Sequence, residues 1–235
     1  MNARFTNKRA LVTGAEGGIG QTLVAALRAE GAQVFGVDRA DGDLMDAAYA
    51  DALPRQAQGA LGGLDLVFNN AGIITRGPIT DSSDEDLART IKINVEAPAR
   101  ICRAAIPLMV ESGGGAIVNT ASCWGLRPGP DHALYCMSKA ALAALTQCMG
   151  RDHAPQGVRV NAVAPNEVDT PMLRTGFKMR GFDPDTAIAE LGKTVPVGHV
   201  ATADEIVAAM LFLASDAARY ITGTVLEVNG GKPVG

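Results

Sequence analysis

The stretch that decides the fold is Thr13-Gly14-Ala15-Glu16-Gly17-Gly18-Ile19-Gly20, a glycine-rich turn between two different apolar patterns. The apolar run 10–13 before it predicts a buried strand, and the periodic pattern 19–30 after it predicts a helix. Glycines in such a turn let the backbone approach a pyrophosphate closely, and the free N–H groups at the helix start point at the anion. The turn therefore predicts a dinucleotide-binding site.

An acidic residue follows the second apolar run. Asp38 ends the predicted strand 33–37, at a distance from Gly20 that suits contact with the adenosine ribose. Its carboxylate can accept hydrogen bonds from both ribose hydroxyls, and it would repel a 2′-phosphate. Arg39 softens that repulsion, but the glycine turn holds no basic residue. The predicted cofactor is NAD rather than NADP.

Short apolar runs alternate with longer helical patterns, which predicts a parallel sheet with helices on both faces. From 171 to 199 Gly, Pro, Lys and Arg break the pattern, so this segment is predicted to be an irregular lid over a site. No linker or repeat marks a second domain, so residues 1–235 are predicted to form one dinucleotide-binding and catalytic domain. The predicted strands are 10–13, 33–37, 64–68, 116–119, 158–162 and 225–228, and the predicted helices are 19–30, 46–61, 84–93, 98–112, 134–154 and 203–214.

Composition argues against several classes of protein. The 235 residues are 47% hydrophobic, enough for a large core, and the formal net charge is −4. Because aromatic content is 4% and basic residues do not cluster, no nucleic-acid partner is expected. No segment looks like a signal peptide or a membrane span. Nothing resembles a metal-ligand cluster, and the four cysteines show no paired spacing, which predicts a reduced, cytoplasmic protein. They are Cys102, Cys123, Cys136 and Cys148.

Tyr135 and Lys139 lie in the run Tyr-Cys-Met-Ser-Lys. If this run is helical, phenol and ammonium share one face, one turn apart. A fixed cation favours the phenolate, and each unit of pKa shift corresponds to about 1.4 kcal/mol. Such a pair can move a proton on and off an alcohol or carbonyl oxygen. Taken alone, the pair is also compatible with a packed tyrosine beside a solvated lysine.

With these residues in place, the whole chain resembles the short-chain dehydrogenase/reductase family. The glycine turn resembles the family's cofactor motif, and Asn69-Asn70-Ala71-Gly72 resembles its second fingerprint. Asn94 matches its mid-helix asparagine, and Ser122 stands before Tyr135 at the spacing of its catalytic serine. Residues 160–165 and 221–223 match two further signatures. The resemblance implies an α/β fold: a single-domain, Rossmann-like, doubly wound parallel sheet.

The resemblance also implies roles. Tyr135 is expected to be the general acid/base, and Lys139 to lower its pKa and hold the nicotinamide ribose. Ser122 is expected to hydrogen-bond the reacting oxygen, Asn94 to hold a water that links Lys139 to solvent, and Thr170 to bind the carboxamide. The structural alternatives are a strand-end hydroxyl for Ser122 and a backbone-bonded amide for Asn94. The implied cofactor-binding residues are Gly14, Gly18, Ile19, Gly20, Asp38, Asp43, Leu44, Asn70, Ala71, Gly72, Tyr135, Lys139, Pro165, Val168 and Thr170.

The chain departs from the family pattern after strand two and after Pro165, among other places. Asp38 and Leu66 are closer together than the family usually has them, so the helix directly after strand two is expected to be missing. The third strand is expected to shrink to a stub around Asp43 and Leu44, with Asp43 at the adenine. Asn166 replaces the glycine after Pro165, and because asparagine tolerates positive φ the turn is expected to survive.

Substrate contacts are predicted from charge. Glu167 is expected to face the nicotinamide and substrate, where its carboxylate suits a molecule with several hydroxyls. A salt bridge to the basic lid, which carries Arg174, Lys178 and Arg180, is an equal alternative. Arg127, His132 and the lid cations could pair with a substrate carboxylate. The predicted substrate-binding residues are Ser122, Arg127, Glu167 and Arg174.

These features predict an NAD-dependent oxidoreductase that reversibly oxidises a secondary alcohol of a small sugar, sugar acid or polyol. One alternative is an NADP-dependent 3-ketoacyl-type reductase, against which Asp38 and Glu167 argue. Another, from a different class, is a non-catalytic dinucleotide-sensing regulator, against which the four retained catalytic residues argue. The resemblance implies a homotetramer, or a homodimer, assembled through helices 98–112 and 134–154.

Overall fold

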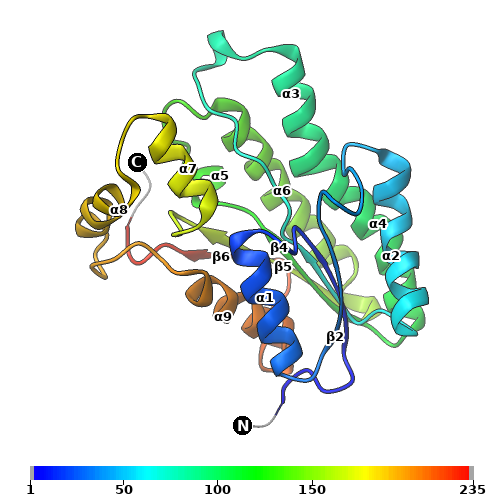
Figure 1. Ribbon diagram of the computed structural model, residues 1–235. Helices are drawn as coiled ribbons and strands as arrows, with labels where there is room; N and C mark the ends of the chain where they lie inside the picture. Colours follow the sequence, from blue (N-terminus) through cyan, green and yellow to red (C-terminus); the bar gives the residue numbers. More distant parts are fainter. Residues whose placement is uncertain (1–2, 233–235) are drawn as a thin grey trace.

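The computed structural model describes residues 3–232, so residues 1, 2 and 233–235 of the predicted domain lie outside the described part (Figure 1). Six parallel strands form one sheet in the order β2-β1-β3-β4-β5-β6. The chain first adds β2 beside β1 and then crosses to β3 on the other side of β1. The carboxyl ends of β1 and β3 therefore flank the switch point where such sheets bind ligands. The strands are β1 Arg9–Thr13, β2 Gln33–Val37, β3 Leu66–Asn69, β4 Gly115–Thr120, β5 Val158–Pro165 and β6 Val225–Val228.

Helices cover both faces of the sheet and enclose two hydrophobic cores (Figure 1). α1 (Gly18–Ala29) and α9 (Ala203–Ala214) pack on one face, and α2 (Ala47–Leu61), α4 (Ala97–Glu111) and α6 (Ala133–Asp152) on the other. Strand side chains alternate between the faces, as the pleat requires. The single-domain, doubly wound α/β fold predicted from the sequence is confirmed. The remaining elements are α3 Asp84–Ile91, a π-helix Lys92–Glu96, α5 Cys123–Leu126, α7 Pro171–Met179, α8 Pro184–Lys193 and 3₁₀ turns at Ile79–Asp81, Ala154–Gln156 and Asp216–Ala218.

The connection between β2 and α2 corrects one expectation. As predicted, no helix lies between Asp38 and Asp43, but Asp43 and Leu44 form no strand stub either. The Asp43 carboxylate instead accepts a hydrogen bond from the Met45 N–H at 2.8 Å, in a turn that leads to α2. A parallel strand needs a crossover of about a dozen residues or more, and the chain between β2 and Asp43 is far too short for one. β2 is consequently an edge strand.

The predicted lid is helical rather than irregular. Residues 171–199 contain α7 and α8, each with proline in its first turn, and Asp183 caps α8 by accepting from the Thr186 N–H at 2.9 Å. Proline at a helix start and a side-chain cap both favour helix formation in sequences with little apolar periodicity. Figure 1 shows α7 and α8 beside β6, at the end of the sheet where α1 begins.

Between residues 3 and 232, no helix is long and apolar enough to cross a membrane. The same range holds no group of three or more His, Cys, Asp or Glu side chains that could bind a metal ion. All four cysteines are unpaired, and three of them are buried.

Candidate active site

The glycine turn and the segment after β3 form one unit. Gly14 has a φ of 66°, and a Cβ there would lie 2.9 Å from the Ala71 Cα. A Cβ on Gly20 would lie 1.9 Å from the Gly14 carbonyl oxygen, so neither position has room for a side chain. The Asn70 amide donates to the Gly14 carbonyl oxygen at 3.1 Å. These contacts leave a backbone-lined cradle at the switch point, which fits the close approach of a pyrophosphate.

The segment after β5 closes on the same turn. A Cβ on Gly18 would lie 2.9 Å from the Thr170 Cβ and 3.0 Å from Pro171. Pro165 ends β5, and Val168 is buried and bridges to Ala201. Asn166 does not need positive φ, because among the described non-glycine residues only Asn7 and Asp131 adopt it. The structure thus brings together the implied cofactor residues of β1, β3 and β5: Gly14, Gly18, Ile19, Gly20, Asn70, Ala71, Gly72, Pro165, Val168 and Thr170.

Asp38 joins this group, and Asp43 and Leu44 do not. The Asp38 carboxylate accepts hydrogen bonds from the Glu16 N–H and the Arg39 N–H, both at 2.8 Å, so it lies against the glycine turn. Asp43 and Leu44 belong to the connection before α2, where the Asp43 carboxylate serves the local turn. The adenine role of Asp43 stays a prediction.

Asn94 links the second fingerprint to α6. It lies in the π-helix, a distortion that occurs often at functional sites, and is 1% exposed. Its amide oxygen accepts from the Ile73 N–H, and its nitrogen donates to the Ile73 carbonyl oxygen, both at 2.9 Å. The same nitrogen donates to the Ser138 hydroxyl at 3.0 Å. The side chain therefore holds the chain after Gly72 against the helix that carries Tyr135.

Tyr135 and Lys139 lie one turn apart in α6, as the spacing predicted. The Lys139 ammonium lies 5.9 Å from the centre of the Tyr135 ring and donates to the Thr120 carbonyl oxygen at 2.7 Å. Burial lowers the pKa of Lys139 to about 8. The predicted lowering of the Tyr135 pKa is wrong for this arrangement: burial raises it, while a hydrogen bond with Ser122 and the charge of Arg76 oppose the rise. Loss of solvent destabilises the phenolate more than its neighbours stabilise it.

Ser122 connects β4, β5 and α6. It is the N-cap of α5, where its hydroxyl oxygen accepts from the Trp124 N–H at 3.2 Å. The hydroxyl also lies 3.5 Å from the Pro165 carbonyl oxygen and hydrogen-bonds with Tyr135. Asn94, Ser122, Tyr135 and Lys139, spread over 46 residue numbers in the sequence, thus surround one point beside the glycine turn.

Two predicted substrate cations are engaged within the chain. Arg127 forms a two-pronged ion pair with Glu227, one contact of which measures 2.6 Å. Arg174 donates to Asp169 at 2.6 and 2.8 Å and to Asp185 at 2.7 Å. Carboxylates of the protein therefore occupy the positions that a substrate carboxylate would need on these guanidinium groups.

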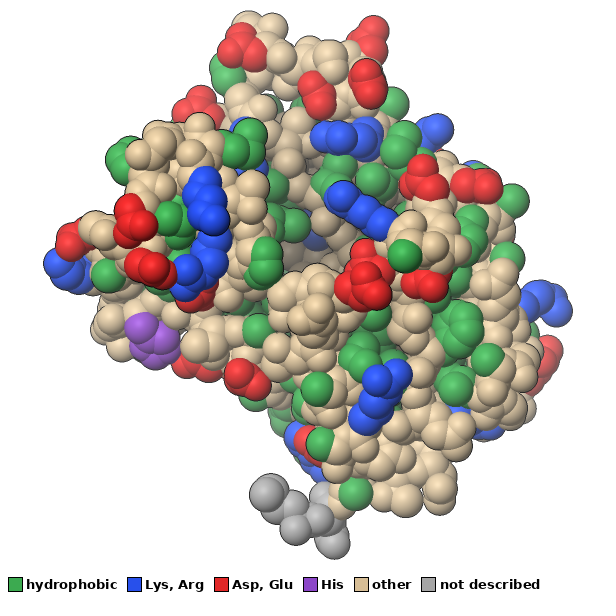
Figure 2. All heavy atoms as spheres, viewed as in Figure 1, with side chains coloured by type: hydrophobic (Ala, Val, Ile, Leu, Met, Phe, Trp, Pro, Cys, Tyr) green, Lys and Arg blue, Asp and Glu red, His purple; other side chains and the backbone are tan. Residues whose placement is uncertain are grey.

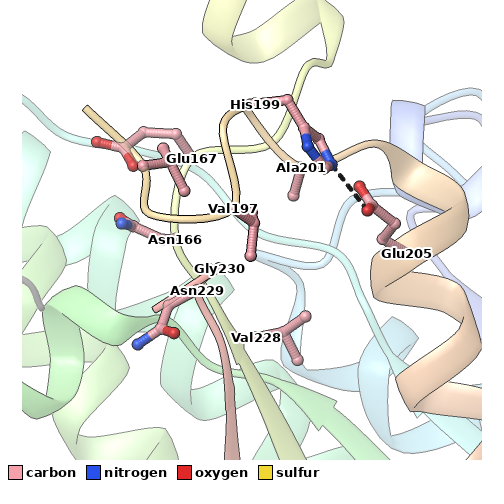
Figure 3. A pocket seen from close by; sticks show the side chains of 10 residues that line it. Asn166, Glu167, Val197, His199, Ala201, Glu205, Val228, Asn229 and Gly230 are labelled. Carbon is pink, nitrogen blue, oxygen red and sulfur yellow. Dashed lines mark hydrogen bonds and ion pairs between the residues drawn. The ribbon is translucent and has the colours of Figure 1, made fainter. Parts of the chain in front are cut away.

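Glu167 lies at a separate cavity of about 250 Å³ (Figure 3). One carboxylate oxygen accepts from Lys232 at 3.2 Å, so its ion pair is with the C-terminal segment rather than with the lid cations. The other oxygen is buried and has no hydrogen-bond partner among the described residues, and the same holds for the Asn166 amide oxygen. None of Asn94, Ser122, Tyr135 and Lys139 lines this cavity. Its walls are Asn166, Glu167, Val195, Val197, His199, Ala201, Glu205, Val228, Asn229 and Gly230.

Sequence reasoning did not select Arg76. It follows the second fingerprint on the loop after β3, and its charge acts on Tyr135. The available signal was its place: a cation a few residues beyond Gly72, at a strand end already assigned to the cofactor.

The chain is similar to known oxidoreductases along nearly its whole length. The family model described as enoyl-(acyl carrier protein) reductase matches residues 38–232. L-xylulose reductase of Bos taurus is 35% identical over 246 residues, covering 98% of this chain and 98% of that protein. 3-oxoacyl-(acyl-carrier-protein) reductase of Chlamydia muridarum is 34% identical over 253 residues, covering 98% of this chain and 99% of that protein.

A solved structure agrees with the fold. The ligand-free aldohexose dehydrogenase of Thermoplasma acidophilum superposes with a TM-score of 0.92 at 29% identity, covering 100% of this chain and 99% of that chain. The glycine cradle at the switch point and the grouped Asn, Ser, Tyr and Lys side chains agree with these similarities to oxidoreductases. The chain belongs to the short-chain dehydrogenase/reductase family and is an oxidoreductase whose fold binds a nicotinamide dinucleotide.

Proposed function

We propose that this protein is an NAD-dependent dehydrogenase that reversibly oxidises a secondary alcohol of a small polyhydroxylated molecule: a sugar, a sugar acid or a polyol. The observation that carries the proposal is the buried Lys139 ammonium, which lies 5.9 Å from the centre of the Tyr135 ring, next to the glycine cradle. The similarity to L-xylulose reductase and to aldohexose dehydrogenase supports a sugar-like substrate.

The side chains divide the work of the reaction. Bound NAD supplies the hydride acceptor. The Tyr135 phenolate takes the hydroxyl proton at its oxygen, and the Ser122 hydroxyl donates to the reacting oxygen and so orients it. Lys139 lies within reach of Tyr135 and its positive charge favours the phenolate during turnover. Asn94 positions these groups by tying Ile73 to α6. In reduction the tyrosine returns the proton to the carbonyl oxygen.

The position of Asp38 supports NAD over NADP. The carboxylate lies on the glycine turn, where it meets the adenosine ribose, and a 2′-phosphate there would face a negative charge. The rival function, an NADP-dependent 3-ketoacyl-type reductase, draws support from the similarity to the Chlamydia muridarum enzyme. Stronger binding of NADPH than of NADH in a fluorescence titration would favour that rival.

Replacing Tyr135 tests the mechanism. In Tyr135→Phe we expect kcat for alcohol oxidation to fall by about 10²- to 10⁴-fold, the usual contribution of a positioned acid/base, because no group remains to take the proton. NADH absorbance, followed over a panel of sugars, sugar acids and polyols, measures it. NAD affinity should stay within about threefold of the wild-type value. The matched control is Tyr220→Phe, since Tyr220 is fully exposed. If Tyr135→Phe turned over as fast as the wild type, the mechanism would be refuted. If the wild-type protein bound NAD but oxidised no member of the panel, the sensing regulator would be favoured.

We also propose a cytoplasmic homotetramer, or homodimer, assembled through α4 and α6. Met137 on α6 is 44% exposed, an apolar side chain that such an interface would cover. The unpaired cysteines suit a reducing compartment. Light scattering on the full chain measures the assembly.

A further inference from the structure

Arg76 and Arg180 both contact Gly176 in α7, a helix of the segment 171–199 that was predicted to be a lid. A Cβ built on the buried Gly176 of α7 would lie 2.6 Å from the Arg76 Nη2, so this guanidinium packs directly on the helix backbone. Arg180, one turn later, donates from its Nε to the Gly176 carbonyl oxygen at 3.1 Å. Arg76 comes from the loop after β3 and Arg180 from the end of α7. Residues far apart in the chain thus place two positive charges side by side.

Neither guanidinium has a carboxylate partner in the described part of the chain. Between residues 3 and 232, no Asp or Glu side chain forms an ion pair with Arg76 or Arg180, whereas Arg127 and Arg174 are held by carboxylates. The Arg180 guanidinium lies over the rings of Phe177 at 4.8 Å and Phe182 at 5.9 Å, which fixes its position without neutralising it. Burial lowers the pKa of Arg76, and the like charge of Arg180 lowers it further. An anion between two guanidinium groups would relieve that repulsion.

The pair is tied to the reacting centre. Gly77, the neighbour of Arg76, donates its N–H to the Asp131 carbonyl oxygen at 2.6 Å and bridges to His132. That segment leads directly into α6 and Tyr135. On the other side, the same loop begins at the second fingerprint and is held by Asn94 through Ile73. Figure 2 shows Lys and Arg side chains around a hollow on this face of the molecule. Arg76 thus stands between the cofactor segment, the tyrosine helix and the lid.

We propose that Arg76 and Arg180 form the binding site for a carboxylate of the substrate, so that the enzyme acts on sugar acids or related polyhydroxy acids rather than on neutral sugars or polyols. The inference rests on the proposed function and narrows its substrate class. Arg76 binds the anion from the side of the tyrosine, and Arg180 binds it from α7. Anion binding thereby draws α7 towards the reacting alcohol and places that alcohol at Ser122 and Tyr135.

The test compares matched substrates. Aldonates and the alditols of the same configuration, such as D-gluconate and D-glucitol, share the hydroxyls of C2 to C6 and differ at C1, which is a carboxylate in one and a hydroxymethyl group in the other. With NAD, we expect wild-type kcat/KM to favour the aldonates. In Arg76→Gln the ratio of aldonate to alditol kcat/KM should fall by about 10- to 100-fold, the usual effect of losing a charge-assisted hydrogen bond. Any change that Arg76 makes through Tyr135 acts on both substrates alike and cancels in this ratio. Arg180→Gln should give a smaller loss in the same direction. Arg219→Gln, an exposed arginine at a distance from the site, is the control and should leave the ratio unchanged.

A second variant tests the geometry rather than the charge. Gly176→Ala keeps both arginines, but its methyl group would meet the end of the Arg76 side chain and displace it. We expect the ratio of aldonate to alditol kcat/KM to fall about 10-fold. An unchanged aldonate preference in both Gly176→Ala and Arg76→Gln would overturn the proposal.

Malonate binding separates this inference from the proposed function. Malonate carries carboxylates and no hydroxyl, so its binding, measured by calorimetry, does not depend on turnover. We expect at least about 10-fold weaker binding in Arg76→Gln than in the wild type and in Arg219→Gln. Arg76-dependent malonate binding without oxidation of any panel member would support the anion site and refute the proposed function. If the wild type oxidised alditols and its preference for aldonates were the same in Arg76→Gln, the anion site alone would be refuted. Equal losses on both substrates, with an alkaline shift of the pH profile, would also overturn it, because Arg76 would then act only through Tyr135 and not on the carboxylate.

Discussion

At the scale of single residues, Lys139 shows how burial sets chemistry. It is 4% exposed, and its ammonium has one hydrogen bond, to the Thr120 carbonyl oxygen. With a pKa of about 8 it lies close to the point where it loses its charge, whereas an exposed lysine would stay charged. The folded protein therefore favours the charged form of this lysine, next to Tyr135, much less than the unfolded chain does.

Lys139 therefore predicts a pH dependence of stability. The folded-state pKa of about 8 lies below the unfolded value of 10.5, so between these values the unfolded chain binds more protons. The free energy of unfolding should rise with pH in this window, by up to about 3 kcal/mol relative to Lys139→Met. Urea unfolding of both proteins at pH 7 to 10 measures the difference. The buried Cys102 and Cys123 have pKa values raised to about 12 and act in the opposite direction, but they are common to both proteins. A difference that stays constant with pH would contradict the prediction.

Asp38 predicts cofactor choice at the same scale. In Asp38→Ala we expect NADH affinity to fall about 10-fold and the preference over NADPH to disappear, because the ribose loses its acceptor and the repulsion is removed. Asp38→Asn is the informative companion: it keeps an acceptor for the Glu16 N–H but removes the charge. If discrimination against NADPH persists in Asp38→Asn, charge is not its origin. Fluorescence titration measures both affinities.

At the scale of elements, helix ends depend on residues elsewhere in the chain. Arg159 on β5 donates to the carbonyl oxygens of Leu213, Ala214 and Ser215 at 2.7 to 3.1 Å. These are the last carbonyls of α9, which have no partner within the helix. The arginine also places a positive charge at the negative end of the helix. A strand residue thus completes a helix that packs on the same sheet.

Removing this cap should destabilise the protein without changing its chemistry. We expect Arg159→Met to lower the free energy of unfolding by about 2 to 4 kcal/mol, because several buried carbonyl groups lose their donor. Arg151→Met, at an exposed arginine, should change it by less than about 0.5 kcal/mol. Denaturant unfolding at one fixed protein concentration measures both, and kcat/KM of Arg159→Met should stay within about twofold. A stability equal to that of Arg151→Met would show that water replaces the cap.

At the scale of the whole molecule, the candidate site is an assembly of strand ends. β1, β3, β4 and β5 each end in a segment of the site, and the start of α7 touches the glycine turn. The shortened connection after β2 leaves that strand at the edge of the sheet, with one side unpaired. A ligand that contacts several of these segments adds interactions between strand ends that are otherwise held together only by the sheet.

NAD should consequently stabilise the whole fold. At a concentration about 100 times its Kd, it should add about 2.7 kcal/mol to the free energy of unfolding. For a chain of this length that corresponds to a rise in Tm of about 5 to 10 °C. Differential scanning calorimetry measures it, with NADP at the same concentration as the comparison. An equal rise with NADP would contradict the assignment of Asp38.

The sequence by itself determined the parallel sheet and the glycine turn, and its resemblance to the family implied the grouping of Asn94, Ser122, Tyr135 and Lys139. The sheet and the turn are encoded locally, by apolar periodicity and by glycines at fixed spacing, and the ends of parallel strands meet by topology. The sequence did not determine which charges are free. Only the tertiary structure paired Arg127 with Glu227 and Arg174 with Asp169, left Arg76 and Arg180 without a carboxylate between residues 3 and 232, and raised the pKa of Tyr135. Ion pairing and desolvation depend on distances between segments far apart in the chain, and no local pattern encodes those distances.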